Sequence, residues 1–168
     1  MEFGAMHCTP TDPNCGSCPF EEICVAKIAG DQKILPLKAK AKAKQERFFS
    51  YFMVRCDDMV LMKERSSNDI WQGLFEFLLI ETKKKTSFSE VLTLVPMIAE
   101  KSIEFEYGPY KHILSHQILH ATFYAVVVNK KKFDAIKKQY SLEEINISEI
   151  TSTPKPVLIS KYLKAHKF

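Results

Sequence analysis

The sequence predicts a mixed α/β (α+β) domain, a sheet flanked by helices, behind a short Cys-rich segment. Five segments have the length of strands and are rich in β-branched and aromatic residues, namely residues 48–55, 59–64, 71–80, 102–107 and 118–128. Apolar residues at helical spacing follow Ser87 and Pro156. Four of the five cysteines lie within residues 8–24, which sets this segment apart.

Composition divides the chain into three parts. Residues 1–27 are rich in Cys and Pro and too short to bury a core of their own. Residues 28–47 contain a Gly-Asp turn signal, one Pro and an alternating Lys/Ala run, which predicts a basic linker. We therefore expect one folded domain over residues 48–168, preceded by a linker and a small appendage.

The first half of the expected domain contains a hairpin and a capped helix. Asp57 and Asp58 separate the first two strands and predict the hairpin turn. Ser87 and Glu90 have the spacing of a capping box, which predicts that a helix begins here. Pro96 predicts that this helix ends early.

The second half ends in a helix. Gly108 and Pro109 predict a turn between the last two strands, and residues 130–150 are ambiguous. Pro156 suits the first turn of a helix. The apolar stripe of that helix is Leu158, Ile159, Tyr162 and Leu163.

Charge and hydropathy exclude some classes of protein. The formal net charge is +4, and no apolar run approaches the roughly 20 residues of a membrane span. The N-terminal residues, MEFGAMHC, lack the basic-then-apolar pattern of a secretory signal. We therefore expect a cytoplasmic protein with reduced thiols and no membrane partner.

Four lysines alternate along the expected linker: Lys38, Lys40, Lys42 and Lys44. In an extended chain their ammonium groups lie on one side, where they would contact nucleic-acid phosphates with salt-sensitive affinity. Solvated linker charge explains the same pattern, and both interpretations stay open.

The cysteines have the spacing Cys-x6-Cys-x2-Cys-x5-Cys, formed by Cys8, Cys15, Cys18 and Cys24. Soft thiolates at short intervals select zinc or an iron–sulfur cluster. Structural zinc sites usually use two close pairs of ligands, whereas one outlying and three compact thiolates suit the corners of a cuboidal cluster. The spacing favours a cluster, and zinc or free thiols remain the alternatives.

The stretch GAMHC, together with these cysteines, resembles the [4Fe-4S] loop of the MutY-type adenine DNA glycosylases of the helix-hairpin-helix superfamily. The resemblance implies that the four cysteines bind the cluster. It also implies a role in base excision repair of double-stranded DNA, where this family removes adenine mispaired with 8-oxoguanine or guanine. The loop TPTDPN between the first two cysteines lacks the basic residues that the family often has there.

A second stretch, Trp71 to Phe77 (WQGLFEF), resembles a strand of the Nudix-like C-terminal domain of the same family. Leu114-Ser115-His116 falls where the family has Phe-Ser-His, the loop that reaches 8-oxoguanine. The resemblance implies a Nudix-like fold in which Ser115 contacts the base, with Leu114 and His116 beside it. A hydroxyl suits this contact because it both donates and accepts. Leu78 replaces the family's proline, and Leu114 replaces its phenylalanine.

Three histidines at four-residue spacing suggest a metal site: His112, His116 and His120. Their neighbourhood is strand-like, and along one strand they would spread over roughly 26 Å. Side chains so far apart cannot bind one ion, so we expect polar or DNA-facing histidines.

The chain lacks the carboxylates of a Nudix hydrolase. Counting from Gly73, Leu79 stands where the Nudix box needs Glu, and the helix after Ser87 offers only Glu90. We therefore expect no divalent-metal site and no pyrophosphatase activity, although a stand-alone Nudix-type pyrophosphatase and a zinc-binding adaptor are the alternative functions.

In the glycosylase family the catalytic Glu and Asp precede the cluster, and only seven residues precede Cys8. We therefore expect the C-terminal portion of such an enzyme, inactive alone, whose partner is the helix-hairpin-helix catalytic domain. Whether an isolated fragment keeps its cluster stays open.

Overall fold

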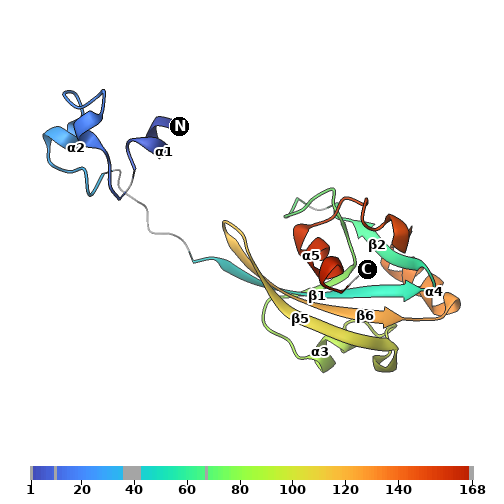
Figure 1. The fold of residues 1–168 in the computed structure, drawn as a ribbon. Coiled ribbons are helices and arrows are strands. Elements are labelled where there is room, and N and C mark those ends of the chain that lie inside the picture. The colour runs from blue at the N-terminus through green and yellow to red at the C-terminus, as the bar shows by residue number, and fades with distance from the viewer. Residues whose placement is uncertain (1, 10, 36–42, 67, 167–168) are drawn as a thin grey trace. The chain divides into compact units, whose positions relative to one another are not determined.

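The computed structural model describes residues 2–9, 11–35, 43–66 and 68–166 of the chain. It divides the chain into two compact units, Met1–Lys42 and Ala43–Phe168 (Figure 1). No helix among the described residues is long and apolar enough to cross a bilayer.

The first unit consists of short helical turns: α1 (Glu2–Met6), η1 (Cys15–Ser17) and α2 (Val25–Ile28). The Phe3 ring contacts Phe20 edge to face, with ring centroids 5.3 Å apart. None of the residues whose burial is described here is buried. The unit therefore has no hydrophobic core within its described part, as expected for a segment this short.

The second unit is built on a 7-stranded mixed sheet within its described residues. Its strands are β1 (Gln45–Cys56), β2 (Met59–Glu64), β3 (Phe75–Glu76), β4 (Leu78–Thr82), β5 (Ile103–Ile113), β6 (Gln117–Val127) and β7 (Glu143–Asn146). The order is β3-β2-β1-β6-β5, with β4 also pairing with β1 and β7 with β2. The β1–β6 pair is parallel and the other pairs are antiparallel. The predicted mixed α+β class is confirmed.

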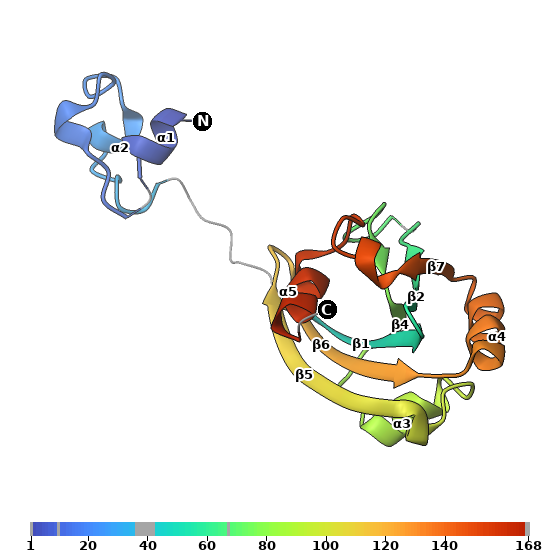
Figure 2. The same ribbon diagram turned by 45° about the vertical axis from the view of Figure 1, so that its right-hand side comes forward.

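Helices lie on opposite sides of this sheet (Figure 2). They are α3 (Phe88–Thr93), α4 (Lys130–Tyr140) and α5 (Val157–Ala165), with single turns η2 (Glu100–Ser102) and η3 (Ile147–Glu149). Because strand side chains alternate between faces, Phe49 and Tyr51 pack with α5, while Phe52 and Val54 pack with α3 and α4. The sheet thus separates two hydrophobic cores.

Local signals in the sequence predict several elements correctly. Asp57, with φ of 51°, joins β1 to β2 as the predicted hairpin turn. The capping box is present, because Ser87 accepts from the Glu90 N–H and donates its own N–H to the Glu90 carboxylate. Helix α5 begins directly after Pro156 and buries all four residues of the predicted stripe. Residues 130–150, left ambiguous above, form α4, β7 and η3.

Three expectations are wrong in detail. Residues 71–74 are not a strand, because Trp71 and Gly73 have φ of 65° and 78° and turn the chain. Gly108 makes no turn between strands but lies in a bulge inside β5. Glycine is required there because a Cβ would lie 2.8 Å from the Ala121 carbonyl oxygen of β6. The expected linker ends early, because β1 begins at Gln45 to pair with β6.

Candidate functional site

The turn between β5 and β6 carries the residues predicted to contact a base. Ser115 and His116 are exposed, whereas Leu114 packs against the core on the α5 side of the sheet. The Leu114 N–H donates to the Gln117 carbonyl at 2.9 Å, and the Gln45 N–H donates to the His116 carbonyl at 3.1 Å. The turn therefore anchors Leu114 and presents Ser115 and His116 to solvent.

Lys44 lies against the same turn. Its Nζ donates to the Leu114 carbonyl at 2.8 Å. The other lysines of the basic run lie outside the described residues: Lys38, Lys40 and Lys42. The structure thus brings Lys44, a predicted phosphate contact, next to Ser115, the predicted base contact.

The three histidines do not follow one strand, as the sequence had suggested, because β5 and β6 form a hairpin. His112 is opposite Leu119, so it faces the α5 side, where it contacts the Trp71 ring at 5.8 Å. His120 faces the other side and stacks on Phe48 at 4.9 Å. Since neighbouring positions of a strand face opposite ways, His112 and His120 are on opposite faces and cannot share a ligand.

The loop between β2 and β3 packs on the same side of the sheet as Leu114. The Gly73 N–H donates to the Arg65 carbonyl at 2.8 Å and closes the loop. Trp71 at its centre packs against the same core as Leu114. The loop and the β5–β6 turn are therefore neighbours of one hydrophobic cluster.

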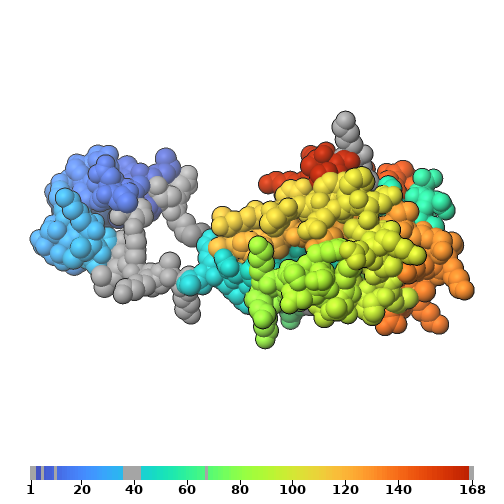
Figure 3. Space-filling view, turned by 90° about the horizontal axis from the view of Figure 1, so that it is seen from below, coloured from blue at the N-terminus to red at the C-terminus, as the bar shows by residue number. Residues whose placement is uncertain are grey.

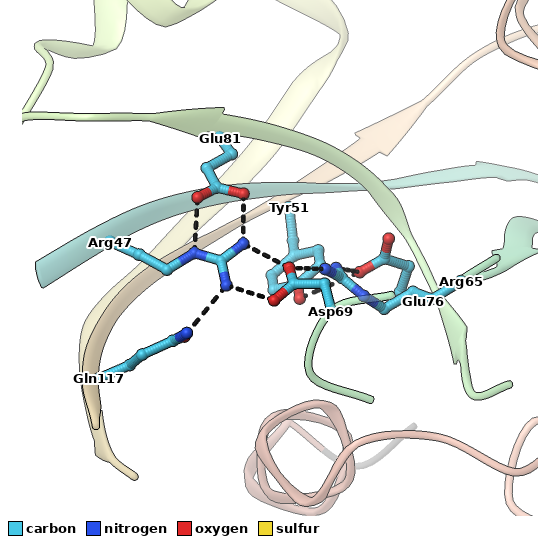
Figure 4. Close-up of polar contacts among 7 residues, drawn as sticks. All are labelled: Arg47, Tyr51, Arg65, Asp69, Glu76, Glu81 and Gln117. Atoms are coloured by element: carbon cyan, nitrogen blue, oxygen red, sulfur yellow. Dashed lines mark hydrogen bonds and ion pairs between the residues drawn. The ribbon is translucent and has the colours of Figure 1, made fainter. Parts of the chain in front are cut away.

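A buried arginine joins these segments (Figure 4). Arg47 is 9% exposed, and its guanidinium lies 5.0 Å from the Phe49 ring centroid. It donates to both carboxylate oxygens of Glu81, at 2.6 and 2.7 Å, and to both of Asp69, at 2.8 and 2.6 Å. A further bond of 3.0 Å reaches the Gln117 side chain. One side chain of β1 therefore contacts β4, β6 and the β2–β3 loop.

A second arginine extends this network inward. Arg65 donates to Asp69 at 2.9 Å and to Glu76 at 2.5 Å. Glu76 also accepts from the buried Tyr51 hydroxyl at 3.3 Å. Paired and hydrogen-bonded in this way, the buried charges are compensated.

The network shifts the titration of its members. The Arg47 guanidinium lowers the pKa of Asp69 to about 2, and the hydrogen bonds to Glu81 and Asp69 raise the pKa of Arg47. Burial raises the pKa of Glu76, against the opposing effect of Arg65, and burial also raises the pKa of Tyr51. Arg47 and Asp69 thus remain an ion pair at neutral pH.

Sequence reasoning missed this network. The three residues bonded to Arg47 lie 22 to 70 residues from it along the chain, so no local motif joins them to it. One local signal was present, because Arg47 alternates with Phe49 and Tyr51 on the inward face of β1. A charge at such a position needs a partner.

The opposite face of the sheet carries a groove of about 640 Å³. Figure 3 shows this side, where α3 and its flanking segments (green) leave the start of β1 (cyan) in view. The Phe48–His120 stack lines the groove at one position and Tyr124 with Phe88 at another. Helix α3 contributes Phe88 to this lining, and its Glu90 is not part of the groove.

The four predicted cluster ligands border one cavity but are not gathered around a single point. Cys8, Cys15, Cys18 and Cys24 all line one cavity of about 30 Å³ in the first unit. Lys27 and Glu21, which form an ion pair, also line it. Among the described residues, no three His, Cys, Asp or Glu side chains lie close enough to hold a single metal ion. Four soft thiols at one cavity are a donor set that fits an iron–sulfur cluster.

Comparison with known protein families matches residues 50–165 to the NUDIX domain. The chain belongs to the NUDIX domain family. The match runs from within β1 to the end of α5 and includes both Trp71 and the β5–β6 turn. The Nudix-like fold expected from the two motifs is thereby confirmed.

Relatives of this NUDIX-domain chain are adenine DNA glycosylases. That of Buchnera aphidicola subsp. Schizaphis graminum is 28% identical over 160 residues, 94% of this chain and 45% of the relative. That of Buchnera aphidicola subsp. Acyrthosiphon pisum is 25% identical over 124 residues, 71% of this chain and 33% of the relative. The chain thus spans less than half the length of these relatives. The expected resemblance to adenine DNA glycosylases is confirmed.

A solved structure shares the fold of the NUDIX domain. The C-terminal domain of mouse MUTYH, solved in complex with human PCNA, matches with a TM-score of 0.54 and 11% identity. The match covers 72% of this chain and 87% of that chain. At this identity the match shows the fold alone.

Proposed function

We propose that this chain supplies the 8-oxoguanine-recognition part of an adenine DNA glycosylase of base excision repair. The observation that carries the proposal is the β5–β6 turn, which presents Ser115 and His116 to solvent from a NUDIX domain whose relatives are adenine DNA glycosylases. The partner is double-stranded DNA with 8-oxoguanine opposite adenine.

Ser115 reads the damaged base in this proposal. 8-Oxoguanine differs from guanine in having a donor at N7 and an oxygen at C8. The Ser115 hydroxyl both accepts and donates, so it can pair with either group. Leu114 packs against the core and anchors the turn, and the exposed His116 lies beside Ser115.

In this proposal Lys44 adds affinity for the DNA phosphate backbone and does not distinguish one base from another. Its ammonium group donates to the Leu114 carbonyl at the recognition turn. A phosphate of the bound duplex would accept from the same ammonium group, either in place of this carbonyl or together with it. Such contacts position DNA without reading sequence. The same role is proposed for Lys38, Lys40 and Lys42.

The first unit is proposed to bind a [4Fe-4S] cluster through Cys8, Cys15, Cys18 and Cys24. Their common cavity supports this assignment, and a single zinc ion would require four thiolates at about 2.3 Å from one point. When bound, the cluster supplies metal–sulfur cross-links to a segment with no buried residue among those described. We propose that residues 1–27 form the cluster loop, that a linker follows from residue 28, and that the recognition domain begins with β1 at Gln45 and not at residue 48.

Excision of adenine is assigned to a helix-hairpin-helix catalytic domain acting with this chain. Glycosidic cleavage requires a carboxylic acid and a carboxylate placed around the scissile bond. No residue of this chain is proposed to be catalytic. The NUDIX domain binds the base opposite the adenine that the catalytic domain removes.

Equilibrium binding to matched duplexes tests this function. The chain should bind a duplex with 8-oxoguanine opposite adenine more tightly than one with guanine opposite adenine. Ser115→Ala should reduce this preference, whereas Ser89→Ala, an exposed serine of α3, should leave it unchanged. Equal affinity of the wild-type chain for both duplexes would refute the proposal.

A further inference from the structure

Every donor of the Arg47 guanidinium is used. Arginine has five N–H donors in a fixed fork, and Arg47 makes five hydrogen bonds. Two go to Glu81, two to Asp69 and one to Gln117, with donor–acceptor distances from 2.6 to 3.0 Å. Donors saturated by three separate partners fix the orientation of all three relative to β1.

The bond to Gln117 reaches the recognition turn. Gln117 is the first residue of β6, and its carbonyl accepts the Leu114 N–H at 2.9 Å, which closes the turn. Its side chain accepts from Arg47. A displacement of Gln117 therefore changes the bond that holds Leu114 and, with it, the position of Ser115.

The bonds to Asp69 reach the loop between β2 and β3. Asp69 precedes Trp71 by two residues, and its carboxylate is held by Arg47 and by Arg65. Trp71 in turn contacts the Phe49 and His112 rings, with centroid distances of 6.5 and 5.8 Å. Asp69 thus fixes the loop at the side where Trp71 meets β5.

We infer that Arg47 is a positioning residue that holds the Ser115 turn and the Trp71 loop as one rigid DNA-reading surface. The part of this inference that concerns DNA rests on the proposed function, whereas the positioning of the two segments does not. The turn presents Ser115, and the loop packs Trp71 against the same hydrophobic cluster as Leu114. Arg47 itself is buried, so in this inference it acts through the turn and the loop and not by contacting DNA.

Net stability alone is a weak explanation of this arrangement. Buried ion pairs are expensive to desolvate, and well-packed apolar residues often replace them without loss. Lysine could not substitute, since its ammonium group lacks the planar fork that pairs with two carboxylates at once. The geometry favours a role in orientation, which a test must separate from a role in folding.

Four variants separate the two branches of the network. Gln117→Ala removes the bond to the turn and keeps both carboxylate pairs, whereas Asp69→Asn weakens the bond to the loop. Arg47→Met removes both. Arg55→Met is the matched control, because Arg55 lies at the other end of β1 and pairs with Glu104 at 3.6 Å.

Two measurements without DNA test the positioning. Gln117→Ala should raise hydrogen exchange at the Leu114 amide by about tenfold and leave the fluorescence of Trp71, the only tryptophan of the sequence, unchanged. Asp69→Asn should shift that emission to longer wavelength and leave the Leu114 amide protected. Arg47→Met should do both.

The third measurement is the ratio of affinities for 8-oxoguanine and guanine duplexes. Gln117→Ala should lower this ratio about threefold or more, and Arg55→Met should not. If Arg47→Met fails to fold, Gln117→Ala and Asp69→Asn decide the matter. The inference would be overturned if Gln117→Ala and Asp69→Asn matched Arg55→Met in all three measurements: hydrogen exchange at the Leu114 amide, Trp71 emission and the ratio of duplex affinities. A wild-type chain without preference would refute the proposed function, while exchange and emission would still decide the positioning.

Discussion

Tyr162 of α5 stacks on Phe123 of β6, with ring centroids 4.2 Å apart and planes within 5°. Both side chains are fully or almost fully buried. This contact attaches the last helix to the centre of the sheet, on the side where Leu114 and Trp71 also pack. The stability of the domain and the support of the proposed recognition surface therefore both depend on this contact.

Tyr162→Ala should lower the free energy of unfolding by about 3–5 kcal/mol, because it leaves a cavity against Phe123. Denaturant unfolding of the chain measures this change. Val157→Ala, at an exposed position of the same helix, should cost less than about 1 kcal/mol. Equal losses in the two variants would show that α5 is not packed as described.

Acid should weaken the Arg47–Asp69 pair. The pKa of Asp69 is lowered to about 2 in the folded chain, below the value of about 3.9 for an unfolded chain. A carboxylate with a depressed pKa stabilises the fold above its unfolded pKa, and this contribution is lost as pH falls from about 4 toward 2. The contribution is about 2 kcal/mol. Asp69→Asn should remove this part of the pH dependence of unfolding, and an unchanged slope would contradict the ion pair.

Lys44→Ala should weaken binding to damaged and undamaged duplexes by the same factor. A phosphate contact contributes to the salt dependence of affinity, so the slope of log affinity against log salt should become shallower by about 1. Lys138→Ala, on α4 away from the turn, serves as the control. A change in the preference for 8-oxoguanine without a change in slope would show that Lys44 does not contact phosphate.

The chain purified under anaerobic conditions should contain iron and acid-labile sulfide in the ratio of a [4Fe-4S] cluster. Cys18→Ser should lower the iron content, because it removes one ligand from the common cavity. Cys56→Ala should leave it unchanged, since Cys56 is buried in the NUDIX domain. Stoichiometric zinc in place of iron would establish the zinc-binding alternative.

Signals between near neighbours in sequence predicted the elements that depend on them. The Ser87–Glu90 capping box and the Asp57 hairpin turn each involve residues within three positions, so composition and spacing suffice. Gly108 was misassigned because the reason for a glycine there lies in another strand. The Ala121 carbonyl of β6 comes too close to Gly108 for any side chain. Trp71 was misassigned because a bulky residue with positive φ has no sequence signature.

The candidate site likewise contains residues that local motifs predict and residues whose contacts depend on the complete fold. Short motifs in the sequence selected Ser115 and the four cysteines as candidates, and the structure brings the cysteines to one cavity. The Arg47 network was missed, because its partners come from separate elements and meet only when the sheet is complete. Lys44 was selected for its charge in a linker, whereas its contact with Leu114 depends on the early start of β1.

The central claim, that the β5–β6 turn reads 8-oxoguanine, is tested most directly by an amide chemical-shift titration. The chain is titrated with a duplex containing 8-oxoguanine opposite adenine and, separately, with the guanine counterpart. The difference between the two titrations should be concentrated at Ser115, His116 and Gln117. Differences confined to the groove around Phe48 and Tyr124, or no difference at the turn, would contradict the claim.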